Sequence, residues 1–303
     1  MPDHFPGYVT HMTTYKNYRE VLLLTIVGAI LALTLYVYVR ADSELNRKYD
    51  VPLAPLEFPE GPGIVAEGER LARIRGCFWC HGASLEGQKY FAEAGKGIIA
   101  VAPDLTRVAR EYSRAEMART VRHGVKPDGT SLQPAMPSFA YYNMSDADVA
   151  AIITYISSLP EQDGFQGRFE LLPIGWVRWV LGRLPSNVAD LIDHTAPRPD
   201  PALAGSPENR GRYLAESICT ECHGDNGRVR VPGSPNLEIA AAYTKTNFIR
   251  LIRTGIPMGE RDIDYHMVDA SKYRYTLLTE AEISAMYAFF RSLVPGTPNK
   301  DSP

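Results

Sequence analysis

The longest apolar stretch of the chain lies near its beginning. Residues 21–39 contain no charged side chain and are bounded by Glu20 and Arg40. A helix of this length rises roughly 30 Å, about the thickness of the hydrocarbon core of a bilayer. A cleaved signal peptide is the competing interpretation, but the stretch is longer than a typical signal-peptide core, and residues 41–44 make a poor cleavage site. We therefore expect 21–39 to be an uncleaved membrane-spanning helix.

Further along, apolar residues recur at the three- and four-residue spacing of an amphipathic helix. One such helix is predicted after Ser145 and another after Thr279. Their apolar faces consist of Val149, Ile152, Ile153 and Ile156 in the first and of Ile283, Met286, Tyr287 and Phe290 in the second. Both begin with the sequence of a capping box, Ser145-Asp-Ala-Asp148 and Thr279-Glu-Ala-Glu282. Shorter helices are expected near 113–123 and 246–254, and because little of the chain alternates as a strand does, the predicted fold class is all-α.

The chain beyond the apolar stretch contains an internal repeat. Its matching segments are Gly68-Glu-Arg-Leu-Ala-Arg-Ile-Arg-Gly-Cys77-Phe-Trp-Cys80-His81 with Gly211-Arg-Tyr-Leu-Ala-Glu-Ser-Ile-Cys219-Thr-Glu-Cys222-His223, and Arg119-Thr-Val-Arg-His-Gly124 with Arg250-Leu-Ile-Arg-Thr-Gly255. In both copies a methionine follows the last glycine by twelve residues, at Met136 and at Met267. We therefore expect two copies of one module.

The repeat and the apolar stretch together divide the chain. The expected parts are a cytoplasmic N-terminal segment 1–20, the span 21–39, a tether 40–59, a first module 60–160, an apolar and proline-rich linker 161–205, a second module 206–296 and a C-terminal tail 297–303. Each module has roughly 100 residues, which is enough for a small domain.

Composition narrows the function classes. The chain has 303 residues, of which 45% are hydrophobic, so it is not a disordered chain. Its 32 Lys and Arg are balanced by 35 Asp and Glu, so the composition does not indicate a polybasic nucleic-acid-binding protein. The four cysteines all lie in the repeated motif, so the chain is not a disulfide scaffold.

The repeated motif has the form Cys-x-x-Cys-His, which is typical of covalent haem c attachment. Its residues are Cys77, Cys80 and His81 in the first copy and Cys219, Cys222 and His223 in the second. Two cysteines on one helical turn can each form a thioether with the same porphyrin, and the next histidine gives iron a nitrogen ligand. A redox-active pair, or one zinc site shared by all four cysteines, is the alternative. The adjacent histidines and the matched methionines favour two covalently attached haems.

A second iron ligand is expected on the opposite side of each haem. In the first copy Met136 stands in Pro134-Ala-Met136-Pro137, where the prolines fix an extended backbone that can present the sulfur. Met144 is the rival, although it precedes a helix N-cap and is expected to pack there, and Met117 is expected in the core. A methionine opposite a histidine raises the reduction potential of haem iron.

The second copy leaves this ligand open. Met267 matches Met136 in spacing but lacks flanking prolines. His266 and Met258 are the alternatives. In both copies the carbonyl of a proline, Pro103 or Pro235, is a candidate acceptor for the Nδ1–H group of the motif histidine.

These motifs, the methionines and the closing helices resemble class I cytochrome c domains over about 60–160 and 206–296. The tandem arrangement behind an apolar span is similar to the membrane-anchored dihaem cytochromes c of bacterial respiratory chains. The resemblance implies helices packed around two haem c groups, ligated by His81 with Met136 and by His223 with Met267. It also implies electron transfer without catalysis, between a quinol-oxidising complex or dehydrogenase and a terminal oxidase or other acceptor, as a subunit of a respiratory complex.

The location follows from the chemistry of attachment, because haem c is attached outside the cytoplasm. We therefore expect a single-pass protein of the inner membrane with its haem modules on the periplasmic side. The alternative function is a dihaem enzyme such as a peroxidase, which would need one five-coordinate haem and an acid–base group beside it.

The linker 161–205 is unusually apolar around Trp176 and Trp179. Three interpretations are open for this segment. It can be a strap packed across both modules, a helix at the membrane interface, or a docking surface for another subunit.

Overall fold

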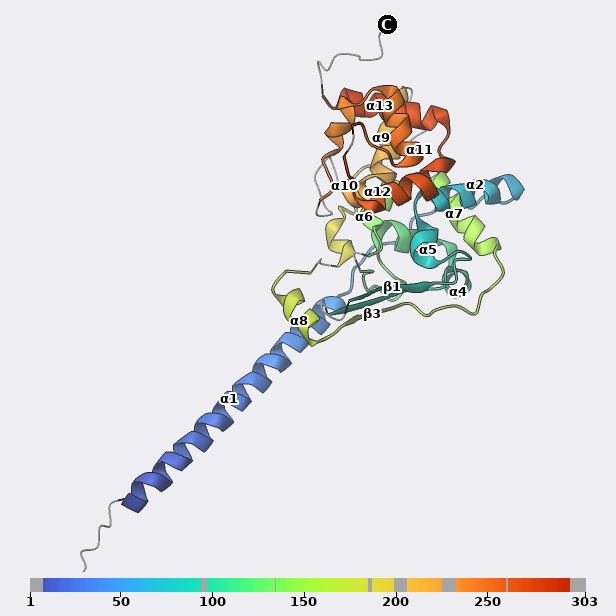
Figure 1. The fold of residues 1–303 in the computed structure, drawn as a ribbon. Helices are drawn as coiled ribbons and strands as arrows, with labels where there is room; N and C mark the ends of the chain where they lie inside the picture. Colours follow the sequence, from blue (N-terminus) through green and yellow to red (C-terminus); the bar gives the residue numbers. More distant parts are fainter. Residues whose placement is uncertain are drawn as a thin grey trace, which may run out of the picture.

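The computed structural model describes residues 8–93, 97–133, 135–184, 187–198, 206–224, 233–259 and 261–294. Figure 1 shows a mostly helical head from which one long helix extends. Helices dominate as expected, together with one small sheet. The expected N-terminal segment is described only from residue 8 onward, and the expected tail 297–303 lies outside the described residues.

The long helix is α1 (Tyr8–Leu45), and it contains the predicted span 21–39. Its portion from Tyr18 to Leu45 is long and apolar enough to cross a membrane, with a mean hydropathy of 2.4 over its most apolar window. Thr25 and Thr34 each donate their hydroxyl to the carbonyl four residues earlier at 2.8 Å, so neither hydroxyl is left unpaired on this apolar helix.

Residues 40–59, which were predicted to be a tether, partly continue α1 and partly contact the head. Helix α1 continues to Leu45, where Arg40 and Glu44 form an ion pair one helical turn apart at 3.4 Å. The chain then runs along the head, and Val51 is buried there. The connection is therefore short and largely fixed to the head.

Two halves of the head repeat the same arrangement. The helices of the first half, residues 62–158, are α2 (Pro62–Ile74), α3 (Cys77–His81), α4 (Leu105–Glu111), α5 (Arg114–His123), α6 (Ser138–Tyr141) and α7 (Asp146–Ser158). The second half, residues 207–292, consists of α9 (Pro207–Ile218), α10 (Thr220–His223), η4 (Leu237–Ala242), α11 (Lys245–Thr254), α12 (Tyr265–Asp269), the π-helical turn η5 (Ala270–Arg274), η6 (Tyr275–Leu277) and α13 (Glu280–Ser292). Each half has its own cluster of buried apolar side chains.

In both halves the first long helix crosses the last one at a glycine. A Cβ atom at Gly68 of α2 would lie 2.0 Å from the carbonyl oxygen of Ala151 in α7, and one at Gly211 of α9 would lie 1.9 Å from that of Ala285 in α13. The backbones of the two helices therefore touch. This contact explains why glycine opens the repeat in both copies.

We expect Gly68→Ala and Gly211→Ala each to lower the free energy of unfolding by about 1–3 kcal/mol, because the new methyl group must push two helix backbones apart. Gly63→Ala is the matched control in the same helix as Gly68, since nothing lies within 4 Å of a Cβ there. Chemical denaturation of the three variants measures the difference. Equal stabilities for Gly68→Ala and Gly63→Ala would contradict the crossing.

The predicted helix starts are confirmed with one difference. Thr279 and Glu282 form a complete capping box at α13, and Ser113 and Glu116 form another at α5. At α7 the hydroxyl of Ser145 accepts from the backbone N–H of Asp148, but the Asp148 carboxylate does not return the bond. This carboxylate accepts instead from Arg75, which follows α2, and from Tyr213 of the second half. The capping box of α7 is therefore only half formed.

The expectation of little strand structure missed a three-stranded antiparallel sheet. It is formed by β1 (Gln88–Glu93), β2 (Ile98–Ala102) and β3 (Arg168–Leu171), in that order. Gln88 pairs with Ala102, and Ile98 pairs with Leu171 of β3, which comes from the predicted linker. Strands of four to six residues are too short for a clear alternation. The sheet lies at the end of the head from which α1 leaves (Figure 1).

The rest of the linker also packs on the first half and on α1. Helix α8 (Pro173–Val180) lies beside α1, and the turn η1 (Val188–Leu191) places Val188 in the apolar cluster of the first half. Tyr142 donates its hydroxyl to the carbonyl of Ala196 at 2.6 Å. The contacts of these linker residues are thus with the first half and with α1, whereas the predicted strap was to pack across both modules.

Candidate haem-binding sites

Each Cys-x-x-Cys-His motif forms a single helical turn that ends at a glycine, Gly82 or Gly224. Helix α3 carries Cys77, Cys80 and His81, and Gly76 before it adopts a left-handed conformation with φ of 76°. Helix α10 carries Cys222 and His223 directly after Cys219. A helical turn brings the two thiols of a motif to one side, as attachment to one porphyrin requires.

The histidine ring of each motif is oriented by a proline carbonyl. His81 Nδ1 lies 2.8 Å from the carbonyl oxygen of Pro103, and His223 Nδ1 lies 2.7 Å from that of Pro235. Both predicted acceptors are confirmed. When Nδ1 donates this bond, Nε2 has its lone pair free for a metal, which is the usual orientation of a metal-binding histidine.

Burial favours the neutral forms of the histidine in the first motif and of one cysteine in each motif. Burial lowers the pKa of His81, although the Pro103 carbonyl opposes this, so the ring is neutral and able to bind iron. Burial also raises the pKa of the Cys77 thiol to about 11 and that of Cys219 to about 12. None of the four cysteines forms a disulfide, so each thiol can form a thioether.

A zinc site shared by the four cysteines is not supported by the geometry. All four are described, yet no group of three or more His, Cys, Asp or Glu side chains in the described part of the chain is arranged to hold a metal ion. Cys77 packs against the cluster of the first half, whereas Cys219 belongs to that of the second.

In the first half the candidate methionines occupy different places. Met136 is partly buried against the same apolar cluster as Cys77 and Phe78. Met117 and Met144 are almost fully buried in that cluster, which confirms the core roles predicted for them. Pro134, on one side of Met136, lies outside the described residues, while Pro137 is the N-cap of α6.

In the second half two methionines remain beside the core. Met258 and Met267 are both partly buried against the cluster that holds Cys219. Met267 lies on α12, whose first turn is capped by Asp264. His266 is exposed, with its Nδ1 atom 2.7 Å from the carboxylate of Asp264. This placement favours a methionine over His266.

Comparison with known proteins identifies the first half. The cytochrome c family profile matches residues 65–160, which cover the helices from α2 to α7 and the first motif. Residues 65–160 are a cytochrome c domain. Such a domain holds haem c covalently, so the thiols of Cys77 and Cys80 and the free Nε2 of His81 fit the group that the family implies.

The relatives include cytochrome subunits of dehydrogenases and a dihaem cytochrome. The chain is 25% identical to the fructose dehydrogenase cytochrome subunit of Gluconobacter japonicus over 76% of this chain and 52% of the relative. It is 33% identical to the gluconate 2-dehydrogenase cytochrome c subunit of Pantoea cypripedii over 53% of this chain and 38% of the relative. A diheme cytochrome c-type protein of Cereibacter sphaeroides is 25% identical over 53% of this chain and 57% of the relative. The chain thus spans only about half, or less, of the first two relatives.

The cytochrome c domain meets the second half through a buried arginine that the sequence did not single out. The Nε atom of Arg274 donates to the carbonyl of Ile74 at 3.0 Å, and its guanidinium pairs with Glu221 inside the second motif. A Cβ atom at Gly76 would lie 2.9 Å from Arg274 Cζ. One charged side chain therefore touches the start of the first motif and the middle of the second.

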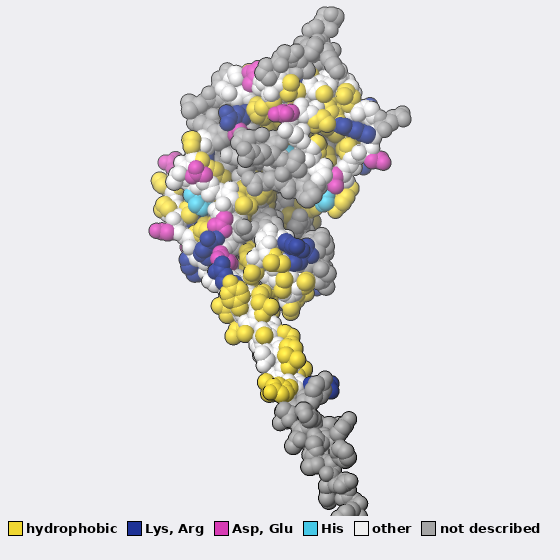
Figure 2. All heavy atoms as spheres, turned by 90° about the vertical axis from the view of Figure 1, so that its left-hand side faces the viewer, with side chains coloured by type: hydrophobic (Ala, Val, Ile, Leu, Met, Phe, Trp, Pro, Cys, Tyr) yellow, Lys and Arg dark blue, Asp and Glu magenta, His cyan; other side chains and the backbone are white. Residues whose placement is uncertain are grey.

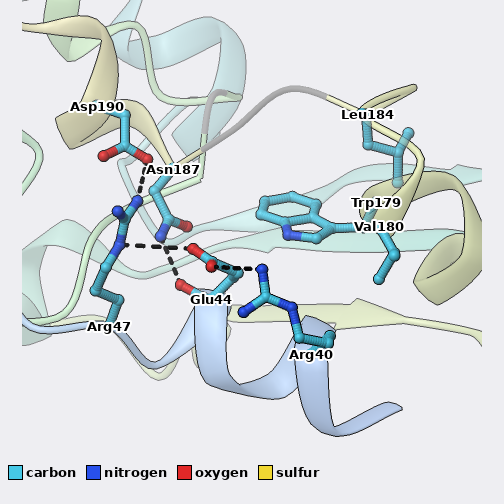
Figure 3. Close-up of a pocket in the computed structure, with 9 residues that line it drawn as sticks. Arg40, Glu44, Arg47, Trp179, Val180, Leu184, Asn187 and Asp190 are labelled. Carbon is cyan, nitrogen blue, oxygen red and sulfur yellow. Dashed lines mark hydrogen bonds and ion pairs between the residues drawn. The ribbon is translucent and has the colours of Figure 1, made fainter. Parts of the chain in front are cut away.

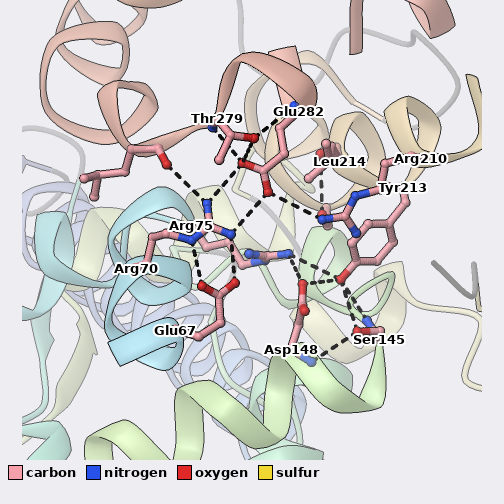
Figure 4. Close-up of polar contacts among 12 residues, drawn as sticks. Glu67, Arg70, Arg75, Ser145, Asp148, Arg210, Tyr213, Leu214, Thr279 and Glu282 are labelled. Atoms are coloured by element: carbon pink, nitrogen blue, oxygen red, sulfur yellow. Dashed lines mark hydrogen bonds and ion pairs between the residues drawn. The ribbon is translucent and has the colours of Figure 1, made fainter. Parts of the chain in front are cut away.

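A second polar network joins the same two halves (Figure 4). Arg75 is fully buried and donates to Asp148 at 2.7 Å, and Tyr213 of the second half donates to the same carboxylate. Glu282 of the second half accepts from Arg70 of the cytochrome c domain at 3.1 Å. These contacts between distant segments hold the two motifs in a fixed relation.

We expect Arg274→Met to lower the free energy of unfolding by about 3–5 kcal/mol, because it leaves the carboxylate of Glu221 buried without its partner. The matched control is the double variant Arg274→Met with Glu221→Gln, which removes the charge as well and should recover part of the loss. Denaturant unfolding of both variants gives the comparison. A cost below about 1 kcal/mol for the single variant, as for a surface pair, would contradict the role assigned to Arg274.

Proposed function

We propose that the chain is a membrane-anchored dihaem cytochrome c subunit that receives electrons from a dehydrogenase. In this proposal one haem is attached at Cys77 and Cys80 and the other at Cys219 and Cys222. The observation that carries it is the proline carbonyl that orients the histidine in both motifs, at 2.8 Å and 2.7 Å. Relatives that are cytochrome subunits of fructose, gluconate and alcohol dehydrogenases support the choice of electron donor.

The ligands follow from the positions of the side chains. We assign His81 with Met136 to the first iron, and His223 with Met267 to the second. Each pair combines an oriented imidazole with a sulfur beside the same apolar cluster. Haem, when bound, supplies the one-electron carrier, and the protein supplies ligands, orientation and a water-poor surrounding that set its potential. Two ligands on each iron leave no open position for a substrate, which is why we assign electron transfer rather than peroxidase chemistry.

Contact between the first motif and the second half supports electron exchange between the two sites. Trp79, inside the first motif, packs against the apolar cluster of the second half and stacks on His266 with 6.4 Å between ring centroids. Arg274 and Glu221 fill the space between the motifs nearby. Two attachment sites bridged by one buried side chain favour rapid transfer from one to the other.

The location is proposed from the attachment chemistry. Helix α1 would cross the inner membrane with its start in the cytoplasm, and both motifs would lie on the periplasmic side, where haem c is attached. The acceptor would be a terminal oxidase or another redox protein of the respiratory chain.

Purification in mild detergent, followed by mass spectrometry of the co-purifying chains, tests the partner. We expect a dehydrogenase catalytic subunit, and we expect addition of its substrate to reduce both haems of the isolated complex. A chain that purifies alone, and that no sugar, sugar-acid or alcohol substrate reduces in membranes, would contradict the assignment to a dehydrogenase. Rapid binding of carbon monoxide to one native reduced haem would instead indicate an enzyme with an open iron site.

A further inference from the structure

Helix α8 is fixed rigidly at the point where α1 meets the head. Gly175 packs against Gly97, and a Cβ atom on Gly175 would lie 2.1 Å from the Gly97 carbonyl oxygen. Leu172 donates its N–H to that same carbonyl at 2.9 Å. On the next turn Trp179 packs against Phe169 of β3, with ring centroids 6.5 Å apart. The side of α8 that carries Gly175 and Trp179 is therefore held by the sheet.

The opposite side of α8 is apolar and exposed. Ile174, Val177 and Leu181 follow one another at helical spacing, and 49%, 41% and 61% of their surfaces are exposed. Figure 2 shows apolar side chains continuing from the long helix onto the base of the head. Leaving three large aliphatic side chains in water on a short, rigid helix is costly, at about 25 cal/mol for each Å² of apolar surface.

The position of Trp176 indicates how deep this apolar side would lie in a bilayer. Its ring lies edge-on to Tyr38 with 5.0 Å between centroids. Tyr38 is one residue before the end of the apolar span 21–39, so Trp176 lies at the level where the span leaves the hydrocarbon. Tryptophan and tyrosine concentrate at this level of a bilayer.

Charged side chains begin just beyond that level. A groove between the end of α1, α8 and η1 contains Arg40, Glu44, Arg47 and Asp190 (Figure 3). Arg40 pairs with Glu44 at 3.4 Å, and Arg47 pairs with Asp190. The order along α1 is thus apolar span, aromatic pair, charged groove, which is the order of the layers of a membrane from its core outward.

We propose that α8 is a second membrane contact, which lies in the plane of the lipid surface with Ile174, Val177 and Leu181 inserted between the headgroups. The occupant of this apolar side is lipid, since it continues the surface of α1 that would already face the bilayer. Together α1 and α8 hold the head at a fixed height and tilt, which a single helix could not do. The proposal rests on the membrane-spanning role of α1.

Spin labelling of the full-length protein in vesicles of phosphatidylcholine and phosphatidylglycerol tests this contact. The native cysteines would be occupied by thioethers, so Val177→Cys offers one site for a nitroxide, and the unsubstituted chain shows the background. Leu23→Cys in the span is the lipid reference, and Asn209→Cys, exposed on α9, is the aqueous reference. The ratio of nitroxide accessibility to oxygen over that to a nickel chelate rises with depth in the bilayer.

We expect a ratio at Val177 several-fold above that at Asn209 and below that at Leu23. A ratio at Val177 equal to that at Asn209, with Leu23 in lipid, would overturn the membrane contact while leaving the anchor intact. A label at Val177 shielded from both reagents would overturn it in favour of a protein partner. An aqueous ratio at Leu23 would overturn the anchor and this proposal together.

Discussion

A variant with Cys219→Ala and Cys222→Ala is expected to keep one haem c instead of two, and Cys77→Ala with Cys80→Ala is expected to keep the other. The two pairs lie on separate helical turns, and Cys77 and Cys219 pack in different apolar clusters, so we expect the loss of one attachment site to leave the second site intact. The ratio of haem to protein should therefore fall by half in each variant. Pyridine haemochrome absorbance together with a protein assay measures this ratio.

Thr220→Ala is the matched control, because Thr220 lies between Cys219 and Cys222 and carries no thiol. It should keep both haems. An unchanged ratio in either double-cysteine variant would show that the motif concerned holds no haem, and would remove that site from the account.

Replacing Met136 by alanine is expected to lower the potential of one haem by on the order of 0.1 V or more, within the roughly 0.8 V range over which axial ligands set haem potentials. In the proposed arrangement the sulfur of Met136 would favour reduced iron, and its loss would also leave an open position on that iron. Redox titration of the visible spectrum measures the potential, and carbon monoxide binding to the reduced protein reports the open position.

Met144→Ala separates a ligand from a core residue in the same half. Met144 is 1% exposed, so its truncation should cost about 2–5 kcal/mol of unfolding free energy. It should leave both potentials where they are. If Met136→Ala and Met144→Ala have the same effect on the spectrum and potential, Met136 is not the ligand. Met267→Ala and Met258→Ala form the corresponding pair in the second half.

Local features of the site could be predicted from the sequence because they depend on neighbouring residues. The motif turns and the cap residues Ser145 and Thr279 are examples. The acceptors Pro103 and Pro235 were also predictable, since they occupy the same place in both copies of the repeat. A repeat of this kind supplies an internal comparison that a single sequence otherwise lacks.

Features that join distant segments could not be predicted in this way. Arg274 meets Ile74 across two hundred positions of sequence, and no periodicity or motif marks Arg274. The sequence predicted that Asp148 completes a capping box, but its carboxylate accepts hydrogen bonds from Arg75 and Tyr213 instead. Strand β3 is short and lies in a segment that looked like a linker, and its partner β2 is some seventy residues earlier.

The central claim is that this chain carries two haem c groups, one on each motif. The most direct measurement is the mass of the purified chain, followed by mass spectrometry of its proteolytic peptides. We expect the mass of the polypeptide plus two haems, with one haem on the peptide containing Cys77 and Cys80 and one on the peptide containing Cys219 and Cys222. A chain without added haem, or with haem on the first peptide alone, would contradict the account.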